Sequence, residues 1–204
     1  MAKILFSPIG GSDPIRNFRD GSMLHICRYY LPDKVILYLT GEMYQHHLQD
    51  NRYVYCLEEL SKKISHPFDI EIITRDELKE VQDYEYFYDD FRTCIGQITS
   101  QMNSEDELFL NVSSGTPAMK NALIILATLA EFSFKPIQVS TPLKRSNYMD
   151  ENVRKYEVEE QWLLDEDNEE NADVTSRCEE VKSLNLIKLL KTNILEKHLM
   201  AYDY

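Results

Sequence analysis

The sequence predicts an α/β fold in which helices cover a Rossmann-like, doubly wound and mainly parallel sheet. Two periodicities alternate along the first 140 residues. Short apolar runs bounded by turn residues are typical of buried parallel strands, and longer stretches between them have helical spacing. Each helical stretch stands between two strand-like runs. Strands and helices that alternate in this way form right-handed crossovers within one sheet.

Each element follows from its own run of residues. The strands are expected over Lys3–Ser7, Lys34–Leu39, Phe68–Thr74, Glu107–Val112 and Phe134–Ser140. The helices are expected over Ser22–Leu31, Glu42–Ser65, Asp83–Met102 and Thr116–Phe132. One face of the third helix carries the aromatic residues Tyr84, Phe87, Tyr88 and Phe91. We interpret this aromatic face as part of the core rather than as a base-stacking platform.

The pattern changes after residue 140. Val153–Leu164 alternates in part, which predicts a hairpin or edge strand that completes a domain of residues 1–164. Asp165–Asp173 holds six acids and no base, which predicts a solvated linker over residues 165–174. In the last segment, residues 175–204, we expect an amphipathic linker helix over Thr175–Leu199. Its apolar face has no obvious partner, so we expect the chain to be part of a longer protein.

Composition argues against several classes of protein. The formal net charge is −13, from 22 Lys and Arg against 35 Asp and Glu, whereas binding of duplex nucleic acid requires clustered cations. The sequence lacks both an apolar run long enough to span a membrane and a signal sequence at its start. The four cysteines are far apart, which predicts buried thiols in a reducing compartment. A cytoplasmic protein without a metal or cofactor is expected.

Two loops at the carboxyl ends of predicted strands are the candidate site, because open α/β sheets bind ligands there. In the second loop, Thr116 is placed to cap a helix, Pro117 suits its first position, and Gly115 lets backbone approach a ligand. Free N–H groups at such a helix start predict an anion site, although a capped turn without a ligand is the alternative. The candidate binding residues are Ser7, Pro8, Ile9, Gly10, Gly11, Ser12, Asp13, Asn111, Ser113, Ser114, Gly115, Thr116, Pro117 and Lys120.

Two other nucleotide-binding motifs do not fit these loops. The pair Gly10-Gly11 lacks the third glycine of a dinucleotide fingerprint, which weakens the reading of a nicotinamide-dependent oxidoreductase. No Gly-Lys-Ser or Gly-Lys-Thr of a phosphate-binding P-loop occurs anywhere in the sequence.

The two loop sequences together resemble the CRISPR-associated Rossmann fold (CARF) domain. The motifs are Ser7-Pro8-Ile9-Gly10-Gly11-Ser12-Asp13-Pro14 and Asn111-Val112-Ser113-Ser114-Gly115-Thr116-Pro117-Ala118-Met119-Lys120. More narrowly, the chain resembles this domain in the ancillary ribonucleases of type III-A CRISPR systems, over roughly residues 1–200. The resemblance implies a homodimer that binds cyclic oligoadenylate, with a ring of six adenylates favoured over four, at a pocket on the two-fold axis.

The resemblance also implies slow cleavage of the bound ring, as in several CARF domains. A ribose 2′-OH would attack the adjacent phosphate without a metal, and Thr116, Ser114 and Lys120 would be catalytic. The alternative is a non-catalytic module for ligand binding and dimerisation. Family members carry a HEPN ribonuclease domain with an Arg-x4–6-His motif. The one formal match, Arg19 to His25, spans a loop and a helix start and is interpreted as coincidence, so a HEPN domain is expected to be missing.

Overall fold

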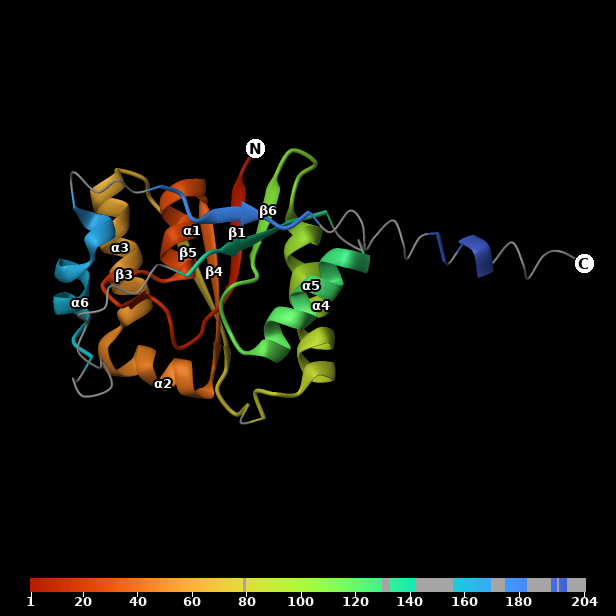
Figure 1. Cartoon of the computed structure of the whole chain (residues 1–204), viewed down its shortest axis with the longest axis horizontal. Helices are drawn as coiled ribbons and strands as arrows, with labels where there is room; N and C mark the ends of the chain where they lie inside the picture. Colours follow the sequence, from red (N-terminus) through yellow and green to blue (C-terminus); the bar gives the residue numbers. More distant parts are fainter. Residues whose placement is uncertain are drawn as a thin grey trace, which may run out of the picture.

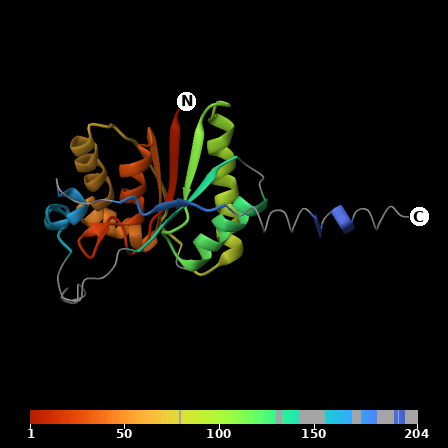
Figure 2. The same cartoon turned by 45° about the horizontal axis from the view of Figure 1, so that its top comes forward.

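The computed structural model describes residues 1–78, 80–129, 133–141, 156–169, 175–182, 192–193 and 195–197. A six-stranded sheet of order β5-β4-β1-β6-β7-β8 runs through it and is covered by helices on both faces (Figures 1 and 2). The strands are β1 (Lys3–Pro8), β4 (Lys34–Thr40), β5 (Asp69–Arg75), β6 (Glu107–Asn111), β7 (Lys135–Val139) and β8 (Cys178–Glu180). The first five are parallel and β8 is antiparallel to β7, which confirms the predicted fold class.

The chain winds outward from β1 through β4 to β5 and then returns to β6 on the other side of β1. The helices that make these connections are α1 (Ser22–Tyr30), α2 (Gly41–Asp50), α3 (Arg52–Ile64), α4 (Tyr84–Gln101) and α5 (Pro117–Leu129). Helices α1 and α3 pack on one face of the sheet, and α4 and α5 on the other (Figure 2). None of the helices in the described part of the chain could cross a membrane.

The single helix expected over residues 42–65 is wrong, because two helices occupy this stretch. Asn51 adopts φ 53° and its N–H donates to the carbonyl of His47 at 2.8 Å, which ends α2. Asparagine tolerates this left-handed conformation better than most residues, so the chain can turn and begin α3 at Arg52.

Successive strand residues point to opposite faces, so each face of the sheet has its own core. Leu5 faces the α1 and α3 side, whereas Phe6 faces the α4 and α5 side. Phe87 and Phe91 of α4 are completely buried against the sheet, and the rings of Phe91 and Phe6 lie 5.5 Å apart. The aromatic face of α4 is therefore part of the core, as predicted.

The C-terminal part differs from the expectation. Val158–Leu164 forms helix α6 rather than a strand or hairpin, and residues 153–155 lie outside the described ones. The antiparallel edge strand is instead β8, within the range expected to be helical. Its three residues include two acids, so they have no apolar alternation to mark them. Of the predicted helix over 175–199, residues 183–191, 194 and 198–199 are not described.

The stretch from residue 165 is also not a solvated linker where it is described. Asp165 and Asp167 are buried, and Glu166–Asn168 forms the short 3-10 helix η2. These acids pack against a small hairpin of β2 (Ile15–Arg16) and β3 (Arg19–Asp20), which the sequence did not reveal. The hairpin extends the first candidate loop, so η2 and β8 lie close to the site.

Candidate ligand-binding site

The two candidate loops meet because β1 and β6 are adjacent parallel strands at the point where the winding of the sheet reverses. Their backbones approach so closely that a Cβ on Gly10 would lie 2.7 Å from the nitrogen of Gly115. Gly115 has φ +85°, which favours glycine. Neither position leaves room for a side chain, so the two glycines let the loops form one surface.

Buried polar side chains hold the loops in place. The Asn111 amide nitrogen donates to the hydroxyl of Ser7 at 2.9 Å and to that of Ser22 at 3.0 Å. Its oxygen accepts from the N–H of Ser113 at 3.0 Å. Ser7 and Asn111 are completely buried, so they shape the loops from below instead of facing a ligand. Pro8 and Ile9 are buried too.

Asp13 links the first loop to the second. Its carboxylate accepts from the hydroxyl of Ser114 and from the N–H groups of Gly10 (3.3 Å) and Met23 (3.1 Å). Burial raises the pKa of Asp13, although these hydrogen bonds and the charge of Lys120 counteract the rise. Because Ser114 is buried and gives its proton to Asp13, the structure favours a supporting role for it over the predicted catalytic one.

Thr116 caps α5 as predicted. Its hydroxyl accepts from the N–H of Met119 at 3.4 Å and donates to the carbonyl of Val81 at 2.8 Å. The hydroxyl proton is thus already used, and a lone pair remains to accept a hydrogen bond. Lys120, one turn into α5, is half-buried, and its ammonium group makes no hydrogen bond or ion pair within the described residues. Its ammonium group is therefore available to an anion.

A small cavity of about 90 Å³ adjoins the loops. Ser12 of the first loop and Ser113 of the second line it, together with Arg16 of β2 and Arg177 just before β8. The sequence predicts neither arginine as a site residue. Arg177 lies far along the chain, in the segment expected to be an amphipathic linker helix, and no local pattern connects it with the loops.

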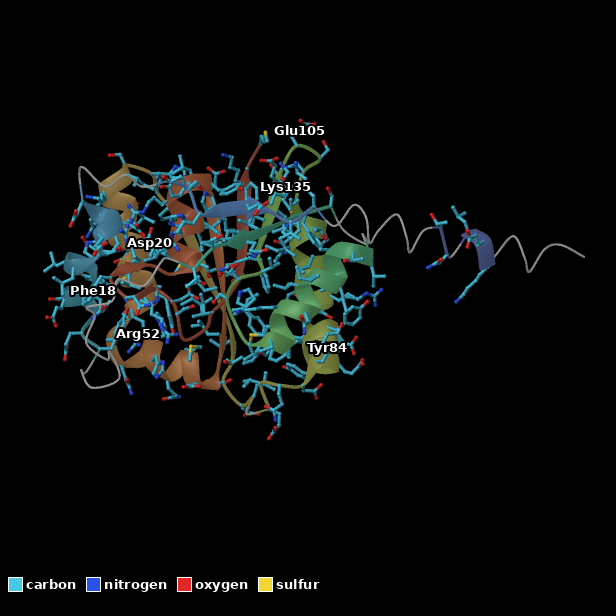
Figure 3. The ribbon with its side chains drawn as sticks, viewed as in Figure 1. Phe18, Asp20, Arg52, Tyr84, Glu105 and Lys135 are labelled. Carbon is cyan, nitrogen blue, oxygen red and sulfur yellow. The ribbon has the colours of Figure 1, made fainter. Side chains whose placement is uncertain are left out.

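The wall of this cavity continues into a buried salt-bridge network on the α1 side of the sheet, where Asp20 lies (Figure 3). Nε and Nη2 of Arg28 donate to the fully buried Asp20 carboxylate at 2.7 and 3.0 Å. Asp167 accepts from Arg19 at 2.7 Å and from Arg177 at 3.2 Å. Burial alone would raise the pKa of Asp20, but hydrogen bonds from His25 and Arg28 lower it.

Asp20, His25 and Asp167 place one potential metal-ligand atom each within 4.8 Å of one another. The carboxylates already accept from arginines, and His25 Nε2 accepts from the backbone N–H of Arg177 at 2.9 Å. Nδ1 of the same ring lies 3.5 Å from a carboxylate oxygen of Asp20 and 3.1 Å from Nη2 of Arg177. These side chains therefore suit a salt-bridge network better than a cation site. His25 is completely buried within this network, which favours the interpretation of the Arg19–His25 spacing as coincidence.

Asp165 is a buried acid of this network that forms no ion pair with a cation in the described part of the chain. Its Oδ1 accepts from the N–H of Asp167 at 3.0 Å. Burial and the neighbouring Asp20 carboxylate raise the pKa of Asp165 to about 8, so the folded protein keeps a proton that the unfolded chain releases near pH 4. The free energy of unfolding should therefore fall as pH rises from about 4 to about 8.

An Asp165→Asn variant tests this dependence on pH, because a carboxamide does not ionise. Its N–H can donate to the Asp20 carboxylate, and its oxygen can accept from the backbone N–H of Asp167, at every pH. We expect the variant to gain stability relative to the wild type as pH rises from 5 to 8, by up to about 1.4 kcal/mol per pH unit. Urea unfolding of both proteins at pH 5, 6.5 and 8 measures the difference. Parallel pH profiles would show that Asp165 is ionised in the fold.

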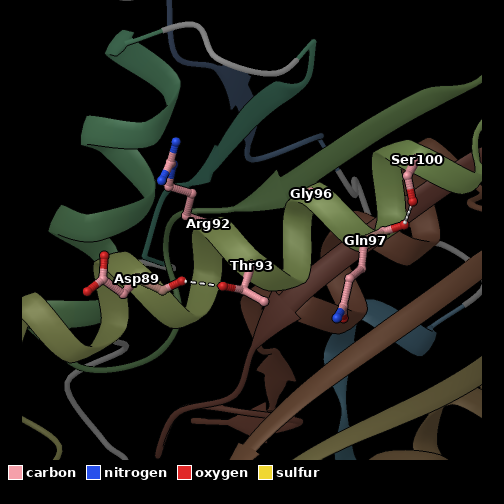
Figure 4. Close-up of a pocket in the computed structure, with 6 residues that line it drawn as sticks. All are labelled: Asp89, Arg92, Thr93, Gly96, Gln97 and Ser100. Carbon is pink, nitrogen blue, oxygen red and sulfur yellow. Dashed lines mark hydrogen bonds between the residues drawn. The ribbon is translucent and has the colours of Figure 1, made fainter.

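A separate hollow lies along the outer face of α4 (Figure 4). Its lining is polar and comprises Asp89, Arg92, Thr93, Gly96, Gln97 and Ser100. All six residues belong to this one helix, and none comes from the two loops. This hollow is therefore not part of the candidate site.

Comparison with known proteins identifies the family. Residues 69–178 match the Cas_Csm6 CARF domain model. The chain is 34% identical to the CRISPR system endoribonuclease Csm6 of Enterococcus italicus and 34% identical to that of Mycobacterium tuberculosis. These alignments cover 99% and 98% of the chain but 46% and 47% of the relatives, so the chain spans about half their length.

A solved structure agrees with this result. The fold matches Enterococcus italicus Csm6 bound to cyclic hexa-2′-fluoro-hexa-dAMP with a TM-score of 0.77 and 32% identity, covering 100% of this chain and 47% of the other. The chain belongs to the family of Csm6 CARF domains.

Proposed function

We propose that this domain is a sensor that binds cyclic oligoadenylate, with cyclic hexa-adenylate as its ligand, at the two loops. The observation that carries the proposal is the joined pair of loops at the reversal point of the sheet. The same fold, over the whole chain, is found in a Csm6 solved with a cyclic hexanucleotide analogue. Other Csm6 proteins are named endoribonucleases, so we further propose that binding here controls a ribonuclease domain in a longer protein.

The chemistry of the loops suits a phosphodiester ring. Gly11 is exposed and Gly10 and Gly115 are half-buried, so backbone groups can approach a ligand closely. The start of α5 brings the positive end of its dipole to the same place, and Lys120 adds the available ammonium group described above. Short-range donors of this kind can hold an anion although the protein as a whole is acidic.

Affinity should therefore depend weakly on salt. We expect cyclic hexa-adenylate to bind in titration calorimetry with a log–log salt slope of about −1.4, the value for two cations, one Lys120 from each subunit. Lys120→Gln should reduce both the affinity and the slope, whereas Lys62→Gln on the surface of α3 should change neither. A slope steeper than about −4 would instead indicate a broad cationic surface.

We also propose that the domain forms a two-fold dimer, since a ring with internal symmetry can offer each subunit the same contacts. Ile125 and Leu129 of α5 are 39% and 49% exposed, and exposed apolar side chains on one helix suit an interface. Sedimentation at tens of micromolar should show a dimer, and Ile125→Asp should convert it to a monomer. Leu48→Asp on α2 is the matched control. A wild-type monomer with and without the ring would contradict the dimer.

We further propose that the domain slowly cleaves the bound ring without a metal. The proton of the Thr116 hydroxyl is donated to Val81, so this oxygen is suited to accept from a ribose 2′-OH and orient it for attack on the next phosphate. The bond from phosphorus to the 5′ oxygen would break as the 2′,3′-cyclic phosphate forms, and the leaving 5′ oxygen would take up the proton that the 2′-OH loses. Lys120 would stabilise the charge that develops on that phosphate. The alternative, a module that binds the ring without cleaving it, is supported by the engagement of Ser114 with Asp13.

A further inference from the structure

Arg177 lies where several segments of the molecule meet. Its N–H donates to Nε2 of His25 in α1 at 2.9 Å. Its guanidinium donates to the carbonyl of Asp20 in β3 at 2.9 Å and to the carbonyl of Ser140, just after β7, at 3.0 Å. The next residue, Cys178, begins β8. One arginine therefore joins the edge strand to a helix, a hairpin and the end of β7.

The second candidate loop is connected to Arg177 through Val139 and Ser140. The hydroxyl of Ser113 accepts from the N–H of Val139, the last residue of β7, at 2.7 Å. The N–H of the following Ser140 donates to the carbonyl of Arg177 at 2.9 Å. A displacement of Ser113 would thus move the end of β7. Arg177 bonds to Ser140 at this end through both its backbone carbonyl and its guanidinium.

The first loop reaches Arg177 through the cavity. Ser12, Ser113 and Arg177 line the same space of about 90 Å³, which has room for about three water molecules, or for one phosphate or ribose group. The Arg177 side chain is only 18% exposed, and its guanidinium donates to Asp167 at 3.2 Å. A group of the ligand that enters this cavity would therefore contact the Arg177 guanidinium.

Strand β8 is a short edge strand. It has three residues, pairs with β7 alone among the described strands, and continues to Val181, whose N–H donates to the carbonyl of Pro136 at 2.8 Å. Cys178 and Val181 pack against the core, whereas Glu179 and Glu180 are exposed. Short edge strands open locally at low free-energy cost. The docking of β8 should therefore respond to small changes at Arg177.

We propose that Arg177 is a positioning residue that couples ligand occupancy of the two loops to the docking of β8 on the sheet. The inference rests on the proposed function for the identity of the ligand. A ligand group in the cavity holds Arg177 against Ser140 and so keeps β8 paired with β7. Because such coupling is reciprocal, loss of the Arg177 contacts should also weaken ligand binding.

Hydrogen exchange of the chain with and without saturating cyclic hexa-adenylate tests the proposal. In the wild type, the ligand should slow exchange of the backbone N–H groups of residues 177–182 at least fivefold. The other edge strand, β5, should not change and serves as the internal reference. Arg177→Lys keeps the charge but not the forked contacts, so it should bind about tenfold more weakly and, at saturation, show no slowing in β8.

Val181→Ala is the control for simple loosening of β8. It should speed exchange in the free protein, yet the ligand should still slow β8 because Arg177 is intact. Calorimetric binding without any slowing of β8 in the wild type would overturn the coupling and leave the sensor function standing. Equal slowing in the wild type and Arg177→Lys would overturn the role of Arg177. No binding heat in the wild type would overturn the sensor function and the coupling with it.

Discussion

Replacing Asp20 with alanine is expected to lower the free energy of unfolding by about 3–5 kcal/mol. The Asp20 carboxylate is completely buried and accepts both hydrogen bonds that Arg28 gives to it. Without the carboxylate, Arg28 stays largely buried with its charge unpaired, and His25 loses the carboxylate that lies 3.5 Å from its Nδ1. Urea unfolding monitored by circular dichroism measures the loss.

The matched control is Glu59→Ala, which removes an ion pair with Lys62 at the surface of α3. It should have a much smaller effect, because exposed pairs are screened by water and salt. An Asp20→Ala/Asp165→Asn double variant shows whether Asp165 ionises and takes over the missing charge. A loss below about 1 kcal/mol in the double variant would mean that the network contributes little to stability.

Thr116→Ala is expected to slow cleavage of cyclic hexa-adenylate about 100-fold while weakening its binding much less. In the proposed cleavage the hydroxyl orients the attacking 2′-OH, so its contribution would be greatest in the transition state. The substitution also removes the cap of α5, which alone costs about 0.5–2 kcal/mol of stability. Rates and affinities therefore have to be measured on folded protein, by single-turnover cleavage beside equilibrium titration.

Thr116→Ser separates the two roles of this residue, since serine keeps a hydroxyl for both the cap and the ligand. It should retain binding and most of the cleavage rate. Equal losses of affinity and rate in Thr116→Ala would make Thr116 a binding residue only. An intact ring after prolonged incubation with the wild type would favour the non-catalytic module.

Before residue 140, the strands of the main sheet and most of the helices could be predicted because their signal is local, whereas the β2–β3 hairpin was missed. Each predicted strand there ends within one residue of the observed strand. For example, the prediction Lys34–Leu39 corresponds to β4 at Lys34–Thr40. Buried parallel strands form continuous apolar runs, and such runs are visible without knowledge of the partner strands. The break at Asn51 was missed because it depends on one backbone conformation rather than on periodicity.

The C-terminal segment could not be predicted in this way. Its acids suggested exposure, but Asp167 is buried because Arg19 and Arg177 neutralise it, and Arg19 is 148 residues distant in the sequence. In the candidate site, too, local contacts could be predicted and contacts between distant residues could not. The cap by Thr116 is local and was predicted, whereas the bond from Ser114 to Asp13 joins two loops and depends on the folded sheet.

The bond from the N–H of Asp20 to Asp167 spans 147 residues, and the bond from Arg177 to His25 spans 152. A ribosome releases the chain from its N-terminus, so the hairpin around Asp20 is complete in sequence long before its partners emerge. Contacts so distant in sequence form slowly, and domains commonly acquire them late. The wall of the cavity beside the two loops should thus be the last part of the domain to assemble during synthesis. A nascent chain would then be unable to bind the proposed cyclic ligand until Arg177 has left the ribosome.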